Sequence, residues 1–288
     1  MRVPVFLLLL SVIICRPAQA APIAIVAAEN FYGDIAQQIG GDRVTVDAIL
    51  ANPNQDPHLF AASPSTARAL ANAQIVISNG VDYDPWMAKL LSASSVANRQ
   101  VIVAGDLVHR KPGDNPHIWY DPTTMPVMAR AIAAALIAAD PNHQVDYARR
   151  LDTVLASLEA IDGEIEGIKA GHGGQTVTAS EPIFGYMAAA LGLQMRDARF
   201  QLSVMNDTEP SASDVAAFEQ GLRNRSAKIM FFNNQVLDPT ITRLLGIARE
   251  AGIPVVGISE LEPPDTPYQA WMLDTLQSVD AALGLPKK

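Results

Sequence analysis

The longest helical pattern in the chain reads HQVDYARRLDTVLASLEAIDGEIEGIKA, residues 143–170. Its apolar residues recur at steps of three and four, which places them along one face of a helix: Leu151, Val154, Leu155, Leu158, Ile161, Ile165 and Ile168. Gly171, Gly173 and Gly174 follow the pattern and are typical of a helix end. Because no strand pattern interrupts this segment, the sequence predicts one long helix over residues 142–171.

Short apolar runs alternate with helix-length segments on both sides of this helix. The runs predict seven strands, at Ile23–Ala28, Val44–Leu50, Ile75–Ser78, Val101–Ala104, Thr176–Ala179, Ile229–Phe232 and Val255–Ile258. Strands that alternate with helices form parallel sheets. We therefore expect an α/β fold of two lobes, residues 21–141 and 172–288, whose parallel sheets are flanked by helices and which are joined by the long backbone helix. The alternative is a single domain within which that helix packs.

Several helix starts combine a capping side chain with a proline at the first helical position. The pairs are Ser63-Pro64, Asp84-Pro85, Asp121-Pro122, Asp238-Pro239 and Thr266-Pro267. Ser211 followed by Asp214 predicts one more start, in the manner of a capping box.

Composition limits the classes of partner. Of the 288 residues, 49% are hydrophobic and only 18% are charged, and the net charge is -9. The chain carries no run of basic residues, whereas nucleic-acid binding requires clustered Lys and Arg. We therefore expect no nucleic acid among its partners.

Residues 1–20 have the pattern of a signal peptide. Arg2 is followed by the apolar run Val3–Ile14, and Ala18-Gln19-Ala20 is a small-x-small cleavage site. The sequence thus predicts an exported, periplasmic protein. Cys15 is the only cysteine and lies within this segment, but Ile14 stands where a lipid-anchor motif has a small residue, which favours simple cleavage. The mature chain would then contain no disulfide and no thiolate metal site.

Two histidines occur in the same local phrase. His58 stands in Asp56-Pro57-His58-Leu59-Phe60, and His117 stands in Asn115-Pro116-His117-Ile118-Trp119. Proline fixes its own φ and disfavours helix at the preceding residue, so each histidine follows a stiff, extended segment. Such a segment suits an imidazole that is held ready for a metal ion or a proton.

Two glutamates that directly follow predicted strands are further candidate ligands. Glu181 follows the strand at Thr176–Ala179, and Glu260 follows the strand at Val255–Ile258. Ligands of open α/β sheets bind beyond the carboxyl ends of the strands, so four groups converge on one cleft, two from each lobe. Two imidazoles with two carboxylates suit a divalent first-row cation.

Other interpretations of these residues stay open. Either histidine can bond a backbone carbonyl, and Glu181 can favour the start of the helix behind it through the helix dipole. Glu262, two residues after Glu260, is a rival fourth ligand. An exported metallohydrolase with one glutamate as general base would use the same groups. The chain has, however, no HExxH helix and no nucleophile elbow.

Taken in order, a set of motifs resembles the metal-binding solute receptors of bacterial ABC transporters for zinc and manganese, over nearly the whole mature chain. The motifs are Asn30-Phe31, Asp56-Pro57-His58, Asn115-Pro116-His117-Ile118-Trp119, Asp121-Pro122, Phe184-Gly185-Tyr186, Glu209-Pro210-Ser211 and Ile253-Pro254-Val255. The resemblance implies a non-enzymatic, monomeric receptor that binds one cation between two lobes and delivers it to a membrane permease. Some relatives act as surface adhesins, which is a third reading. Carried over, the ligand positions are His58, His117, Glu181 and Glu260.

Two departures from the zinc-type pattern bear on the choice between Mn2+ and Zn2+. The segment Gly105–Asn115 is short and holds only His109, where zinc-specific relatives often carry a long loop rich in His and Asp. The third ligand position is Glu181, as in manganese-type members, and not His. Both features favour manganese, although zinc binds such sites more tightly in the intrinsic affinity order. The sequence thus leaves zinc, manganese or iron as the physiological metal.

Overall fold

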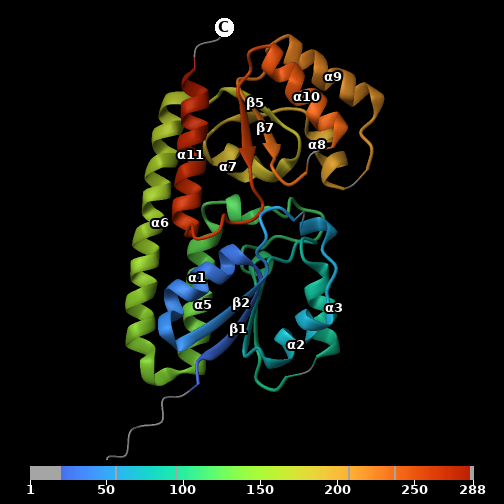
Figure 1. Cartoon of the computed structure of the whole chain (residues 1–288). Coiled ribbons are helices and arrows are strands. Elements are labelled where there is room, and N and C mark those ends of the chain that lie inside the picture. The colour runs from blue at the N-terminus through green and yellow to red at the C-terminus, as the bar shows by residue number, and fades with distance from the viewer. Residues whose placement is uncertain (1–20, 56, 95, 207, 237, 286–288) are drawn as a thin grey trace, which may run out of the picture.

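The computed structural model describes residues 21–55, 57–94, 96–206, 208–236 and 238–285, and only the backbone of His58. Two parallel four-stranded sheets organise the molecule, one in each lobe (Figure 1). The first sheet has the order β2-β1-β3-β4, from strands β1 (Ile23–Glu29), β2 (Val44–Leu50), β3 (Ile75–Ser78) and β4 (Gln100–Val103). The second has the order β6-β5-β7-β8, from β5 (Thr176–Ala179), β6 (Gln194–Met195), β7 (Met230–Asn233) and β8 (Val255–Ile258).

Helices flank both sheets, as the predicted α/β class requires. Those of the first lobe are α1 (Asn30–Gly40), α2 (Pro64–Asn72), α3 (Pro85–Ala93), α4 (Ala104–Leu107) and α5 (Thr124–Ala139). Those of the second are α7 (Gly185–Ala190), α8 (Ala198–Met205), α9 (Ala212–Arg223), α10 (Pro239–Glu250) and α11 (Tyr268–Gly284). Short 3-10 turns are η1 (Gly41–Arg43), η2 (Pro57–Leu59), η3 (Ile118–Tyr120), η4 (Pro141–His143) and η5 (Pro182–Phe184).

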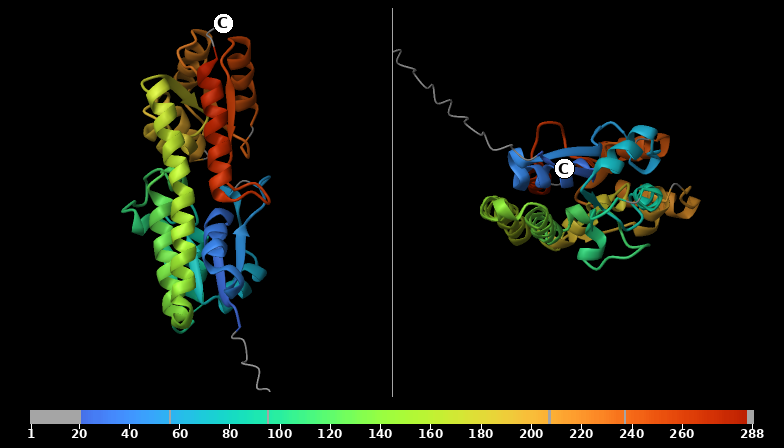
Figure 2. Two further views of the ribbon diagram at one scale, coloured as in Figure 1. Left: turned by 90° about the vertical axis from the view of Figure 1, so that its left-hand side faces the viewer. Right: turned by 90° about the horizontal axis from the view of Figure 1, so that it is seen from below.

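The predicted long helix is α6 (Gln144–His172), which runs along both lobes (Figure 2). Its 29 residues correspond to a length of roughly 43 Å. The predicted apolar face is the one it buries, with Val154, Leu158, Ile161, Ile165 and Ile168 in the core and Leu151 and Leu155 partly buried beside it. Helix α11 packs against α6; its first turn contacts α1 of the first lobe, and the helix then runs along the second lobe (Figure 1). The two-lobe prediction is confirmed.

Three strand predictions differ from the structure by one residue. β4 runs over Gln100–Val103 where Val101–Ala104 was predicted, and β7 begins at Met230 where Ile229 was predicted. β1 continues to Glu29 and β7 continues to Asn233, because backbone pairing goes on past the apolar run that marks each strand in the sequence. β6 was not predicted, since two residues at a sheet edge give no pattern. Among the described residues, no helix is both long and apolar enough to cross a membrane.

Three of the six predicted helix starts are confirmed by a capping hydrogen bond. Ser63 Oγ accepts from Thr66 N at 3.3 Å, Asp238 Oδ1 accepts from Ile241 N at 2.7 Å, and Ser211 Oγ accepts from Asp214 N at 3.1 Å. α3 begins at Pro85 as predicted, although the Asp84 carboxylate bonds elsewhere.

Two predicted helix starts are wrong by one or two residues. α5 begins at Thr124 and not at Pro122, because the Asp121 carboxylate accepts from the backbone N and the hydroxyl of Thr123 in a turn before the helix. α11 begins at Tyr268, with Pro267 as its extended N-cap.

Candidate metal site

His117 forms the first-lobe side of the site and is fully buried. It stands directly before η3, where Pro116 precedes it. Asn115 Oδ1 accepts from the His117 backbone N at 3.1 Å and from its ring Nδ1 at 2.7 Å. In the neutral ring this bond leaves the lone pair on Nε2, which is the arrangement of a metal-binding imidazole held by an outer hydrogen bond.

His58 lies in η2, and its side chain is outside the described part of the structure, as is Asp56. Its loop is nevertheless tied to the second lobe, because the Gln55 carbonyl accepts from Gln235 Nε2 at 2.8 Å. Phe60, two residues on, packs its ring against Trp86, with the centroids 4.7 Å apart. The backbone that carries His58 is thus held at the same lobe boundary as His117.

The two predicted carboxylates are buried and meet at one amide. Glu181 is 2% exposed and Glu260 is 0% exposed. Asn233 Nδ2 donates to Glu181 Oε2 at 3.4 Å and also to Glu260 Oε1. Glu260 Oε2 accepts from Tyr83 OH at 2.8 Å and lies 3.9 Å from His117 Nε2. The structure therefore brings three of the four predicted side chains to one boundary between the lobes.

Glu262, the rival to Glu260, faces a different neighbour. Its backbone N donates to Asn30 Oδ1 at 3.1 Å, and its carbonyl accepts from Asn30 Nδ2 at 2.7 Å. Burial, followed by the negative charge of Asp34, raises the pKa of Glu262 to about 9. Glu262 thus sits against α1, while Glu260 is the glutamate in contact with His117 and Asn233.

Metal–ligand bonds to nitrogen and carboxylate oxygen measure about 2.0–2.2 Å. A cation can therefore lie between His117 Nε2 and Glu260 Oε2, which are 3.9 Å apart. Within the described residues, no three His, Cys, Asp or Glu side chains stand close enough together to hold a metal ion. Glu181 is linked to the His117–Glu260 pair through Asn233.

Hydrogen bonds between the lobes surround this pair. Asn115 Nδ2 donates to the Pro182 carbonyl at 2.7 Å, beside Glu181. Tyr120 OH donates to the Ser259 carbonyl at 2.7 Å, beside Glu260. Each backbone segment that carries a predicted carboxylate is therefore bound to the first lobe next to its ligand position.

The remaining three histidines are not among the predicted ligands. His109 is exposed, His143 is the residue before α6, and His172 is its last residue. Trp86, Trp119 and Trp271 are buried.

Two site residues were missed, Tyr83 and Asn233. Imidazoles and carboxylates that follow strands indicate a metal site, whereas an amide or a phenol there does not. The signal for Asn233 was its position at the end of an apolar run, where the predicted carboxylates also stand.

A buried carboxyl pair lies behind the site in the first lobe. Glu29 is 0% exposed, and burial, then the charge of Asp84 and a hydrogen bond with it, raises its pKa well above the ordinary value. Burial raises the pKa of Asp84 too, but Asp84 accepts backbone N–H groups from Asn79 at 2.7 Å and Gly80 at 2.8 Å. The proton of the pair therefore belongs to Glu29.

Glu29→Gln should stabilise the protein at neutral pH. Glu29 stays protonated in the folded state but ionises in the unfolded chain above about pH 4.5, so wild-type stability falls as the pH rises past that value. Glutamine cannot ionise, and the variant should gain up to about 1.4 kcal/mol over wild type per pH unit. Urea unfolding at pH 5 and pH 8 measures this, with exposed Glu159→Gln as control. An equal difference at both pH values would contradict a protonated Glu29.

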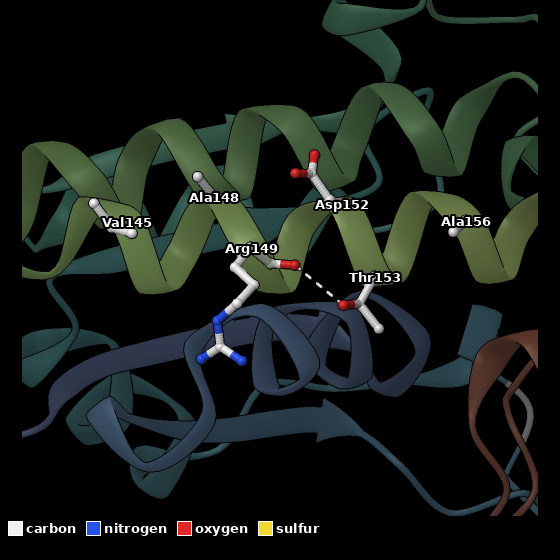
Figure 3. Close-up of a pocket in the computed structure, with 6 residues that line it drawn as sticks. All are labelled: Val145, Ala148, Arg149, Asp152, Thr153 and Ala156. Carbon is white, nitrogen blue, oxygen red and sulfur yellow. Dashed lines mark hydrogen bonds between the residues drawn. The ribbon is translucent and has the colours of Figure 1, made fainter.

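A shallow hollow on α6 lies away from these residues (Figure 3). It is lined by Val145, Ala148, Arg149, Asp152, Thr153 and Ala156, and the Thr153 hydroxyl donates to the Arg149 carbonyl at 3.1 Å. The hydroxyl bonds within its own helix. Asp152 is the one carboxylate among these lining residues, and no histidine lies beside it in the lining.

The chain is similar in sequence to known components of metal-uptake systems. The family model for zinc-uptake complex component A, periplasmic (ZnuA), matches residues 25–282. The iron ABC transporter substrate-binding lipoprotein MtsA of Streptococcus pyogenes serotype M1 is 22% identical, with 93% of this chain and 91% of that protein covered. The manganese ABC transporter substrate-binding lipoprotein PsaA of Streptococcus mitis is 23% identical, over 87% and 86%.

Among solved structures, the periplasmic zinc-binding protein TroA of Treponema pallidum superposes with a TM-score of 0.77 at 17% identity. The superposition covers 92% of this chain and all of that one, which shows a shared fold.

Proposed function

We propose, from the premise that this chain belongs to the ZnuA family of periplasmic metal-uptake components, that it captures Mn2+ or Zn2+ between its lobes for an ABC transporter permease. It is a metal-binding substrate-binding protein, as its family and relatives are. The observation that carries the proposal is the buried contact between His117 of the first lobe and Glu260 of the second. A buried imidazole and carboxylate from different lobes suit a cation that is held between them.

The proposed ligands are His58, His117, Glu181 and Glu260. The Nδ1 bond to Asn115 orients the His117 ring, and Asn233 bonds both carboxylates. The position of the η2 backbone supports His58, since its loop contacts the second lobe through Gln55. A set of two imidazoles and two carboxylates can bind a cation without an open position for water, which suits a carrier better than a catalyst.

The metal is the finer part of the proposal. Relatives at similar identity are named for iron and manganese, and one of the structural neighbours is named for zinc. A site with two carboxylate ligands favours manganese more than a site with more imidazole ligands does. The intrinsic affinity order, in contrast, favours zinc. We propose manganese as the cargo when zinc is scarce, and zinc as a tight competitor.

Release to the permease would involve small movements of the lobes. The contacts of Asn115, Tyr120 and Asn30 join the lobes around the site, and α6 packs along both of them. We further propose that the protein is a monomer and that its signal peptide is cleaved after Ala20 on export. Residues 1–20 lie outside the described residues.

Metal analysis tests the proposal. Protein purified without chelators should contain one Mn2+ or Zn2+ per chain, and competition titrations should rank the two. His58→Ala should lower metal content and metal-induced thermal stabilisation, because it removes one of four ligands. His109→Ala, at an exposed histidine, is the control. Finding neither metal bound would refute the proposed receptor function. If His58→Ala binds metal as tightly as wild type, His58 is not a ligand. Turnover of ester or phosphate substrates that follows metal loading would favour a hydrolase.

A further inference from the structure

The amide of Asn233 contacts both proposed carboxylate ligands of the second lobe. Its Nδ2 donates one bond to Glu181 Oε2 at 3.4 Å and the other to Glu260 Oε1. Asn233 is fully buried, at the end of β7 between the loops that carry Glu181 and Glu260. Two carboxylates that share one donor are held at a fixed separation.

The Asn233 side chain is itself anchored. Its Oδ1 accepts from the Gln235 backbone N at 2.9 Å, and its own backbone N donates to Ser180 Oγ at 3.3 Å. With Oδ1 occupied in this way, the amide must point its two N–H groups at the carboxylates. The orientation is therefore set by the loop after β7 and not by the carboxylates alone.

Gln235 extends this support to the other lobe. Its Oε1 accepts from the Glu260 backbone N at 2.6 Å, and its Nε2 donates to the Gln55 carbonyl at 2.8 Å. Gln55 lies three residues before His58. The two amides thus connect both carboxylates to the loop that carries a proposed histidine ligand.

The first lobe has an asparagine at the equivalent place with different partners. Ala27 pairs with Ile77 in one sheet, and Ala179 pairs with Phe231 in the other. Two residues further on in each sheet, the neighbours are Glu29 with Asn79, and Glu181 with Asn233.

Asn79 uses both N–H groups on the Pro116 and Gly80 carbonyls, at 2.9 and 3.1 Å. Its neighbour Glu29 keeps its proton beside Asp84, as its raised pKa indicates. An asparagine at this strand end does not by itself bond the neighbouring carboxylate. The bonds of Asn233 belong to the site.

We infer that Asn233 is a positioning residue for the metal: it offsets the repulsion between Glu181 and Glu260 and fixes one oxygen of each. The other oxygen of Glu260, Oε2, then faces His117 Nε2 at 3.9 Å. Charge-assisted bonds to a carboxylate are strong, and outer groups that orient ligands contribute 10–100-fold to metal affinity. This inference rests on the proposed function.

Titration of the apo protein with Mn2+ tests it in wild type, Asn233→Ala and Asn233→Leu, which has similar size but no donor. Both variants should bind Mn2+ about 10–100-fold more weakly. The d–d absorption bands of bound Co2+, which report ligand geometry, should shift in both. Asn234→Ala, at the exposed neighbour, is the matched control and should change neither quantity.

The outcomes separate the two proposals. Wild-type affinity in Asn233→Ala and Asn233→Leu would overturn the positioning role and leave the receptor intact. Weaker binding with unchanged Co2+ bands would also overturn it, since that result indicates general loosening of the lobe. Failure of the wild-type protein to bind Mn2+ and Co2+ would overturn the receptor and the positioning role together.

Discussion

Replacing His117 by Ala is expected to lower Mn2+ and Zn2+ affinity by more than about 100-fold, since loss of an outer group alone costs 10–100-fold. The imidazole Nε2 lies 3.9 Å from Oε2 of Glu260, a proposed carboxylate ligand. The fold should survive, because Glu260 keeps its bonds from Tyr83 and Asn233.

Thermal unfolding with and without metal gives a second measure of this loss. At a metal concentration 100 times the dissociation constant, binding stabilises a protein by about 2.7 kcal/mol. If the variant binds 100-fold more weakly, the same concentration stabilises it by only about 0.4 kcal/mol. His143→Ala removes a histidine remote from the site and should keep the full stabilisation. A His117→Ala protein that is stabilised as strongly as wild type would show that His117 is not a ligand.

The parallel sheets could be predicted because their strands are buried and therefore apolar in sequence. Four strands were predicted to the residue: Val44–Leu50, Ile75–Ser78, Thr176–Ala179 and Val255–Ile258. The long helix could be predicted because its apolar face spans both lobes. The edge strand β6 could not, because two residues carry no period.

For the site, the sequence could predict which types of side chain bind metal and which of them follow a strand, but not how they are arranged. Glu29 and Glu181 occupy equivalent strand ends, yet one is paired with Asp84 and the other lies at the lobe boundary. The local sequence does not distinguish the two glutamates, because the difference arises from the residues that pack against each one in the folded protein.

The contacts between the lobes were also beyond the sequence. Tyr83 reaches Glu260 across 177 positions, and Asn30 reaches Glu262 across 232. These pairs have no periodicity, and a tyrosine or asparagine in a loop has many other uses. Only the three-dimensional arrangement shows that Glu260, and not Glu262, contacts His117.

Trp119 is a core residue that also packs against the proposed ligand His117. Trp119→Ala is expected to lower the free energy of unfolding of the apo protein by about 3–5 kcal/mol. The side chain is 0% exposed. Its ring centroid lies 4.8 Å from Phe31, 4.9 Å from Tyr83 and 5.3 Å from His117. Alanine leaves a cavity that the surrounding rings, which also pack on one another, can close only in part.

Trp119→Ala should also lower the affinity for metal, because His117 and Tyr83 each lose the ring they pack against. Urea unfolding with a chelator measures stability, and Mn2+ titration measures affinity. Trp119→Phe is the matched variant. The indole Nε1 has no hydrogen-bond partner among the described residues, so phenylalanine removes part of the packing but breaks no bond of that group. Its cost should be well below that of alanine. Equal destabilisation by the two variants would mean that ring packing is not what Trp119 contributes.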